Sequence, residues 1–122
     1  MKRQIERQVK RGDIYYANLP IEEGSIQAGR RPVVITQSNW LNRNSTSVII
    51  VALTSKIKNP GWDCHYILPK TKGLPKISMV LGEQRKTIEK FQLEDYRGSL
   101  SRDIMKNVTR AIRAAEAEDK RR

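Results

Sequence analysis

The stretch from Gly24 to Val34 reads Gly-Ser-Ile-Gln-Ala-Gly-Arg-Arg-Pro-Val-Val, and it joins a small polar loop to an apolar strand. The glycines that bound the loop permit backbone conformations and close approaches that a Cβ forbids. The proline disfavours helix at the preceding residue, which places Arg31 at the mouth of a strand that begins with Val33. The sequence thus predicts that the guanidinium of Arg31, which is always charged and has five N–H donors, lies beside backbone amides that can face a phosphate. The alternative is a surface loop that ends in two solvated arginines.

Length and composition narrow the class of protein. The 122 residues suffice for one domain with a hydrophobic core, and 24 Lys and Arg against 13 Asp and Glu give a net charge of +11. This charge favours an anionic partner, with nucleic acid first. A single Cys and a single His exclude an intrachain disulfide, a multi-cysteine zinc site and a His-rich cluster, so neither metal nor cofactor is predicted. Without a bilayer-spanning run or a signal-peptide pattern, the sequence predicts a cytoplasmic protein with no membrane contact.

Short β-rich segments separated by polar loops dominate the middle of the chain. Strands are expected at 13–18, 32–37, 47–54 and 64–68, with 77–83 and 86–89 as two strands or as one bent strand. Residues 32–37 and 47–54 hold continuous apolar runs, which are typical of strands covered on both faces. Residues 38–46, rich in Asn and Ser, are expected to form a loop or a short helix.

A helix closes the chain. Ser101 is the expected N-cap, and apolar residues at helical spacing, from Ile104 to Ala115, predict a stripe that packs on the sheet. The fold predicted is mainly β with a C-terminal helix (α+β), as a small, bent SH3-like barrel with long loop insertions. Residues 1–11 are expected to form a basic extension (a mobile arm or a frayed helix), 12–118 the single domain, and 119–122 a charged tail. Because so small a barrel buries few residues, a symmetric homodimer is expected.

Four motifs resemble those of the MazF/PemK family, the toxin components of bacterial toxin–antitoxin systems. They are Arg11-Gly12-Asp13-Ile14-Tyr15, then Gly24-Ser25-x-Gln27-x-Gly29-x-Arg31-Pro32-Val33, then Val51-Ala52-Leu53-Thr54-Ser55, and finally Glu83-Gln84-x-x-Thr87-Ile88. They follow the family's order and extend over roughly residues 10–115.

The resemblance implies an SH3-like barrel of the MazF/PemK/CcdB type that acts as an endoribonuclease, or mRNA interferase. Such a toxin cuts single-stranded RNA at short sequences without a metal, by 2′-OH attack that leaves 2′,3′-cyclic phosphate and 5′-OH ends. The family also implies a homodimer with an RNA groove at its interface, silenced by the acidic tail of a MazE-like antitoxin. The alternative is a non-catalytic RNA- or protein-binding barrel, which includes a toxin of the gyrase-poison kind.

The resemblance places the family's catalytic arginine and threonine on Arg31 and Thr54. An arginine clamp on two phosphate oxygens suits the charge that builds up during 2′-OH attack. Many relatives carry Glu where this chain has Ile26, so Glu83 is the predicted substitute for that carboxylate. The general base stays open, with Glu83 alternatively a solvated carboxylate and His65 interpreted as structural.

A larger set of residues is predicted to contact RNA: Gly24, Ser25, Gln27, Ala28, Gly29, Arg30, Ser55, Lys56, Gln84, Arg85 and Thr87. Arg30 has solvation as its alternative, and Gln84 and Thr87 have a role in closing the sheet as theirs. Trp40 and Trp62 are expected either to stack on bases or to anchor loops on the barrel.

Overall fold

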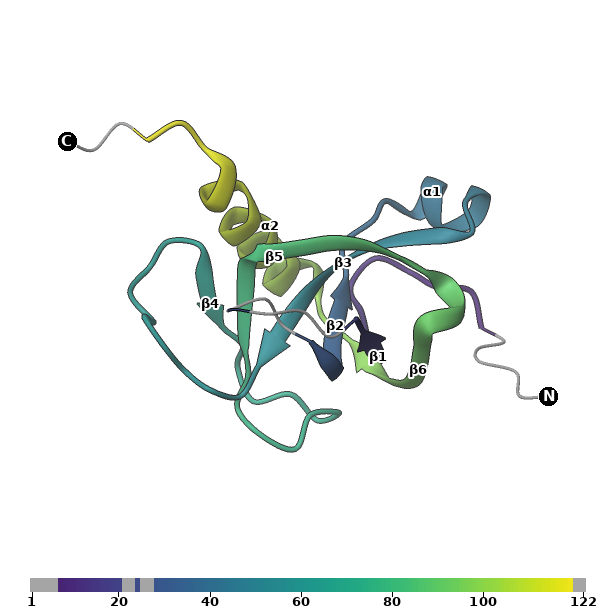
Figure 1. The fold of residues 1–122 in the computed structure, drawn as a ribbon, viewed down its shortest axis with the longest axis horizontal. Helices are drawn as coiled ribbons and strands as arrows, with labels where there is room; N and C mark the ends of the chain where they lie inside the picture. Colours follow the sequence, from purple (N-terminus) through teal and green to yellow (C-terminus); the bar gives the residue numbers. More distant parts are fainter. Residues whose placement is uncertain (1–6, 21–23, 25–27, 120–122) are drawn as a thin grey trace.

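The two apolar runs of the sequence pair with each other inside a six-stranded antiparallel sheet, ordered β4-β5-β3-β2-β1-β6 (Figure 1). The computed structural model describes residues 7–20, 24 and 28–119. Its elements are β1 (Asp13–Leu19), β2 (Gly29–Ile35), α1 (Asn39–Asn44), β3 (Ser47–Thr54), β4 (His65–Ile67), β5 (Met79–Glu89), the 3-10 turn η1 (Lys90–Gln92), β6 (Leu93–Ser99) and α2 (Arg102–Glu116). No helix in the described ranges is long and apolar enough to cross a membrane.

The architecture is mainly β with a C-terminal helix, as predicted, but the barrel is open. Among the described residues no pairing joins the edge strands β4 and β6. β4 has only three residues, and α2 packs against both β4 and β5 at this side of the sheet. Side chains of the helix therefore cover the core where a closed barrel would have a further strand pair.

Each face of the sheet has its own core, which explains the continuous apolar runs. On one face Val34, Val51 and Leu53 pack with Met105, Val108 and Ile112 of α2. On the other face Val33, Ile35 and Ile50 pack with Ile88 and Leu93, because β5, η1 and β6 curl over the sheet. Alternate residues of one strand thus face two different apolar environments, so no polar residue is needed between them.

The C-terminal helix begins as the sequence predicts. The Ser101 side chain accepts a hydrogen bond from the backbone N–H of Ile104, at 3.2 Å, which satisfies one of the free donors of the first turn. Met105, Val108, Ala111 and Ile112 are buried, whereas the predicted stripe residue Ala115 is exposed near the end of the helix.

Two segments differ from the expectation. The strand β6 was not predicted, because in its sequence Leu-Glu-Asp-Tyr-Arg-Gly-Ser only Leu93 is buried. No helix forms over residues 7–11, where Val9 is 2% exposed and belongs to the core, while residues 1–6 lie outside the described ranges. The division into an extension (1–11), a domain (12–118) and a tail (119–122) stays a prediction.

Candidate active site

Arg31 and Thr54 lie at one end of the sheet. The antiparallel register pairs Val33 with Ala52, which are two residues from Arg31 on β2 and from Thr54 on β3. The start of β2 and the end of β3 therefore bring together two side chains that are far apart in the sequence. Both line a groove of about 670 Å³ and a smaller adjoining cavity of about 220 Å³.

The side chain of Arg31 is exposed, but a hydrogen bond to the backbone fixes its position. Its Nε donates to the carbonyl oxygen of Ala28, at 2.9 Å, which fixes the side chain at the last residue of the loop before β2. Because the guanidinium has five N–H donors, this bond leaves the terminal nitrogens for an anion in the groove.

Thr54 is 6% exposed, and its hydroxyl has a fixed partner. Thr54 Oγ1 accepts from the backbone N–H of Lys56, at 3.1 Å. Since this contact uses a lone pair of the oxygen, the hydroxyl proton is left to donate toward the groove.

His65 and Glu83 line the same groove. His65 Nε2 lies 3.0 Å from Glu83 Oε2, and His65 Nδ1 lies 3.1 Å from the carbonyl oxygens of both Lys58 and Asn59. The His65 side chain is 4% exposed and that of Glu83 38%. Burial disfavours the charged ring, but its hydrogen bond to the Glu83 carboxylate and the charge of that carboxylate outweigh burial, so the pKa of His65 is raised.

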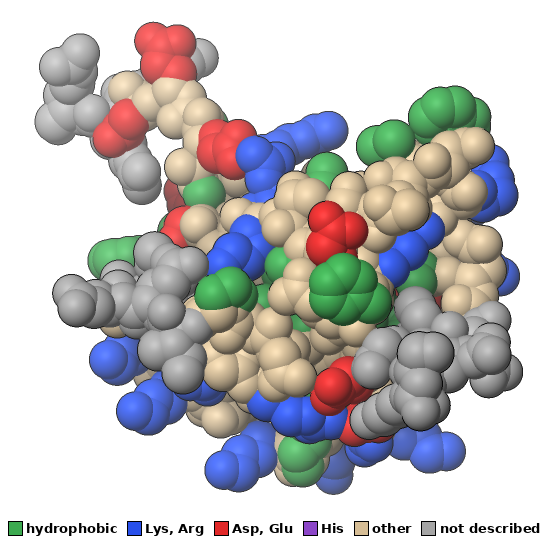
Figure 2. Space-filling view, turned by 45° about the vertical axis from the view of Figure 1, so that its right-hand side comes forward, with side chains coloured by type: hydrophobic (Ala, Val, Ile, Leu, Met, Phe, Trp, Pro, Cys, Tyr) green, Lys and Arg blue, Asp and Glu red, His purple; other side chains and the backbone are tan. Residues whose placement is uncertain are grey.

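Five predicted RNA contacts lie on this groove: Gly24, Ala28, Ser55, Lys56 and Gln84. Trp62 also lines it, 56% exposed and with its ring 5.2 Å from that of His65. Trp62 is thus placed where base stacking is open to it, whereas Trp40 is 63% exposed on α1, outside the groove lining. Lys and Arg side chains surround the lower edge of the face shown in Figure 2.

Four predicted contacts lie outside the groove lining. Arg30 is exposed, pairs with Glu94 and Asp95 of β6 and sits over the Tyr16 ring, and it lines the adjoining cavity rather than the groove. Arg85 pairs with Glu116 of α2. Gly29 lies opposite Leu19 in β1, and Thr87 lies opposite Ile49 in β3. Ser25 and Gln27, together with Ile26, lie outside the described residues.

No local feature of the sequence predicts the contact between His65 and Glu83. The two residues are 18 positions apart and come together because β4 pairs with β5, with His65 opposite Leu81. An eleven-residue strand beside a three-residue one leaves the register undefined by periodicity alone.

Residues 10–115 match the family described as PemK-like, MazF-like toxin of type II toxin-antitoxin system, and the chain belongs to this family. The resemblance inferred from the four motifs is thereby confirmed.

Individual proteins that resemble this chain support the same family assignment. The Endoribonuclease MazF of Staphylococcus saprophyticus subsp. saprophyticus is 40% identical over 105 residues, which cover 85% of this chain and 88% of the relative. A mycobacterial endoribonuclease, solved in complex with its cognate antitoxin, superposes with a TM-score of 0.74 at 23% identity, over 88% of this chain and 94% of that one. MazF from Deinococcus radiodurans superposes with a TM-score of 0.74 at 19% identity, over 89% of this chain and 96% of that one. These structures confirm the predicted fold class.

Proposed function

We propose that the chain is a toxin that cleaves single-stranded RNA at specific short sequences, without a metal, by attack of a ribose 2′-OH on the adjacent phosphate. The observation that carries this proposal is that Arg31 and Thr54 line the same groove, each with donor capacity left after its own local hydrogen bond. The 40% identity to an endoribonuclease supports the same activity.

The attack forms a bond between O2′ and phosphorus and breaks the bond between phosphorus and O5′. Negative charge gathers on the non-bridging oxygens of the five-coordinate phosphorus. The terminal nitrogens of Arg31 bind two of these oxygens, and the Thr54 hydroxyl donates a further hydrogen bond. Both side chains are fixed before substrate arrives, so little reorganisation is needed as the charge develops.

Glu83 is the proposed acceptor of the 2′-OH proton. His65 donates from Nε2 to Glu83 Oε2, which orients the carboxylate and leaves its other oxygen for the substrate. The departing O5′ takes a proton from water. The products are a 2′,3′-cyclic phosphate on the upstream fragment and a 5′-hydroxyl on the downstream one.

The remaining groove residues position the RNA. Lys56 and Lys58 are exposed beside the groove and suit phosphate contacts, while Gln84 and Trp62 suit contacts with bases. The predicted contacts Ser25 and Gln27 precede Arg31 in the sequence and are part of this proposal on the motif alone.

Partners follow from the same groove. We infer a homodimer, silenced when the acidic tail of a MazE-like antitoxin lies over the basic groove. Solved MazE-MazF complexes of Deinococcus radiodurans and the mycobacterial complex support such a partner. We infer action in the cytoplasm, where the RNA substrate and the antitoxin occur together.

End-group analysis tests the proposal. A long RNA is digested in the presence of EDTA, and the 5′ ends of the fragments are sequenced to locate the cut sites. An oligonucleotide that spans one cut site is then made with and without a single 2′-deoxy substitution at the attacking ribose. The all-ribose oligonucleotide should be cut to the two ends named above. The 2′-deoxy oligonucleotide should bind nearly as well and resist cleavage, because the nucleophile is gone.

Efficient cutting of the 2′-deoxy oligonucleotide, or activity that EDTA removes and magnesium restores, would refute the mechanism. Specific RNA binding with no cleavage of any substrate would instead identify the non-catalytic barrel.

A further inference from the structure

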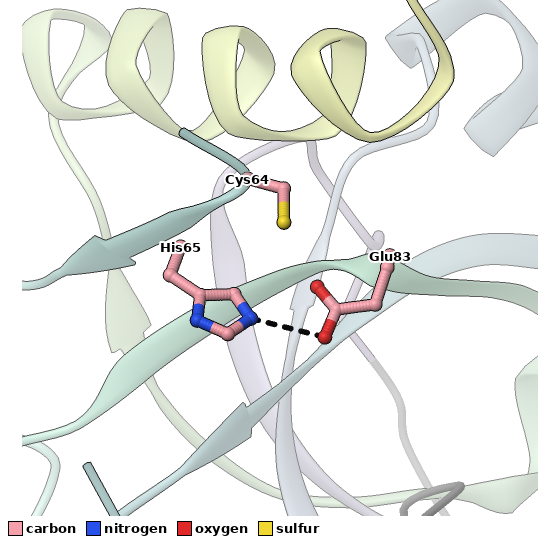
Figure 3. A group of neighbouring side chains, drawn as sticks. All are labelled: Cys64, His65 and Glu83. Carbon is pink, nitrogen blue, oxygen red and sulfur yellow. Dashed lines mark hydrogen bonds and ion pairs between the residues drawn. The ribbon is translucent and has the colours of Figure 1, made fainter. Parts of the chain in front are cut away.

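Three potential metal ligands converge where β4 begins beside β5 (Figure 3). Cys64 directly precedes β4, His65 is the first residue of β4, and Glu83 projects from β5. Their donor atoms, the thiol sulfur, an imidazole nitrogen and a carboxylate oxygen, all lie within 4.8 Å of one another. Counting one Cys and one His excluded the common zinc clusters but not a mixed site of this kind.

Backbone contacts hold the cluster together. The N–H of Gly82 donates to the carbonyl oxygen of Cys64, at 2.8 Å, and the adjacent register pairs His65 with Leu81. The three side chains therefore come from positions that the strand pairing fixes, rather than from independent loops.

The imidazole is oriented as metal-binding imidazoles are. His65 Nδ1 faces the carbonyl oxygens of Lys58 and Asn59, both at 3.1 Å, so this nitrogen carries the proton in the neutral ring. Nε2 faces Glu83, and once this nitrogen has lost its proton its lone pair is available to a metal ion held by Glu83 and Cys64. A backbone carbonyl on the far nitrogen is the usual means by which proteins fix the tautomer of a ligating His.

We propose that Cys64, His65 and Glu83 form a binding site for Zn²⁺, and that its occupancy inhibits RNA cleavage. Thiolate, imidazole and carboxylate together suit Zn²⁺, whereas Mg²⁺ and Ca²⁺ prefer oxygen donors alone. In tetrahedral Zn²⁺ sites the bond lengths place neighbouring donors about 3.3–3.6 Å apart, so the donors here need to move by only about 1 Å. Because His65 and Glu83 both line the groove, a water molecule from the groove could supply the fourth ligand.

Binding releases one proton from the Cys64 thiol and, when the ring is charged, one from His65 Nε2. Zn²⁺ replaces the hydrogen bond between His65 and Glu83 and takes a carboxylate oxygen of Glu83. The inhibitory part rests on the proposed function, in which that carboxylate accepts the 2′-OH proton. The binding part does not depend on it.

Metal alone tests the site. The full chain is freed of metal by chelator and dialysis, then titrated with Co²⁺, for which thiolate ligation gives a charge-transfer absorption band. One equivalent per chain should produce the band, and Zn²⁺ should remove it by displacement. Because loss of an outer-shell partner alone lowers metal affinity about 10–100-fold, Cys64→Ser should lower Zn²⁺ affinity by at least about 100-fold and abolish the band. Glu118→Gln, which removes an exposed carboxylate outside the cluster, should leave both unchanged.

Cleavage assays then test the consequence. Zn²⁺ at saturating concentration should inhibit the unmodified chain by at least tenfold, whereas Cys64→Ser should cleave at the normal rate and resist the same concentration. Absence of the cobalt band, or its persistence in Cys64→Ser, would overturn the site. Zn²⁺ bound through Cys64 with undiminished cleavage would overturn the inhibition. A chain that binds Zn²⁺ but never cleaves RNA would leave the site in place and refute the proposed function.

Discussion

Replacing Arg31 by alanine isolates the contribution of a single guanidinium to RNA cleavage. The side chain is exposed at the start of β2, and its one hydrogen bond to protein is that from Nε to the Ala28 carbonyl among the described residues. Truncation at such a surface position changes the free energy of unfolding by about 0.5 kcal/mol or less. Any large effect of Arg31→Ala must therefore arise in the reaction.

The size of the effect follows from the donors that remain. Loss of one donor to a developing oxyanion lowers kcat about 10²–10³-fold, or about 2.7–4 kcal/mol. The terminal nitrogens of Arg31 can reach two phosphate oxygens, and arginines that stabilise phosphoryl transition states contribute about 10³–10⁵. Arg31→Ala should thus lower kcat by at least about 10³. Arg31→Lys should recover little, because an ammonium is a point charge without the planar fork.

Single-turnover cleavage of a labelled oligonucleotide measures the effect, and binding of its 2′-deoxy form measures affinity separately. With a net charge of +11, the chain should keep most of its affinity for RNA, and the slope of log K against log salt should fall by about one. Arg43→Ala, which removes an exposed arginine from α1, is the matched control and should behave as the unmodified chain. Cleavage by Arg31→Ala within tenfold of normal would refute the assignment.

Two further predictions concern stability. A Cβ on Gly82 would lie 2.4 Å from the Ala111 carbonyl oxygen and 2.7 Å from that of Cys64, both backbone atoms, so Gly82→Ala should lower the free energy of unfolding by about 3 kcal/mol and Tm by about 10 °C or more. The control Gly61→Ala, which has open space at the Cβ, should change Tm little. Equal melting curves for the two variants would contradict this packing. Burial, with the nearby charge of Asp13, raises the pKa of Tyr15 from 10.0 to about 12, so the unfolded chain loses this proton first and the stability of the folded chain falls between pH 10 and 12. The difference in unfolding free energy between Tyr15→Phe and the unmodified chain should therefore grow by about 2–3 kcal/mol across that range. Parallel curves of stability against pH for the two chains, measured by denaturant titration, would show that folding does not shift the pKa of Tyr15.

The elements that the sequence predicted well are those specified locally. β3 occurs at the predicted residues 47–54, because a continuous apolar run with β-branched residues has few other stable environments. α2 begins directly after Ser101 because the cap is a contact between neighbours in the sequence. In both cases the feature that favours the structure can be read from residues of the same segment.

The strand β6 could not be predicted for the opposite reason. Its stability comes from backbone pairing with β1, some 80 residues away in the chain. Its backbone is irregular, with positive φ at Asp95 (49°) and Gly98 (116°) and a register shift against β1. These irregularities interrupt the period-two pattern by which strands are found.

The adjacent arginines illustrate the same limit at the site. Arg30 and Arg31 have the same chemistry, and alternation along β2 only requires that they face opposite sides. Their roles diverge because Glu94 and Asp95, on β6, meet Arg30 and neutralise it. The family motif predicts that Arg31 is the reactive residue, whereas the partners of Arg30 depend on a strand that the sequence did not reveal.

Gly82 links the packing of α2 to the geometry of the groove. The absence of a side chain at this position lets the backbone of α2 at Ala111 rest directly on β5. The same residue donates to the Cys64 carbonyl, which holds the start of β4 against β5 and so sets His65 beside Glu83. A shift of the helix would therefore alter the distance between that carboxylate and its imidazole partner. The packing of the C-terminal helix thus contributes to the geometry of the residues to which we assign both proton acceptance and Zn²⁺ binding.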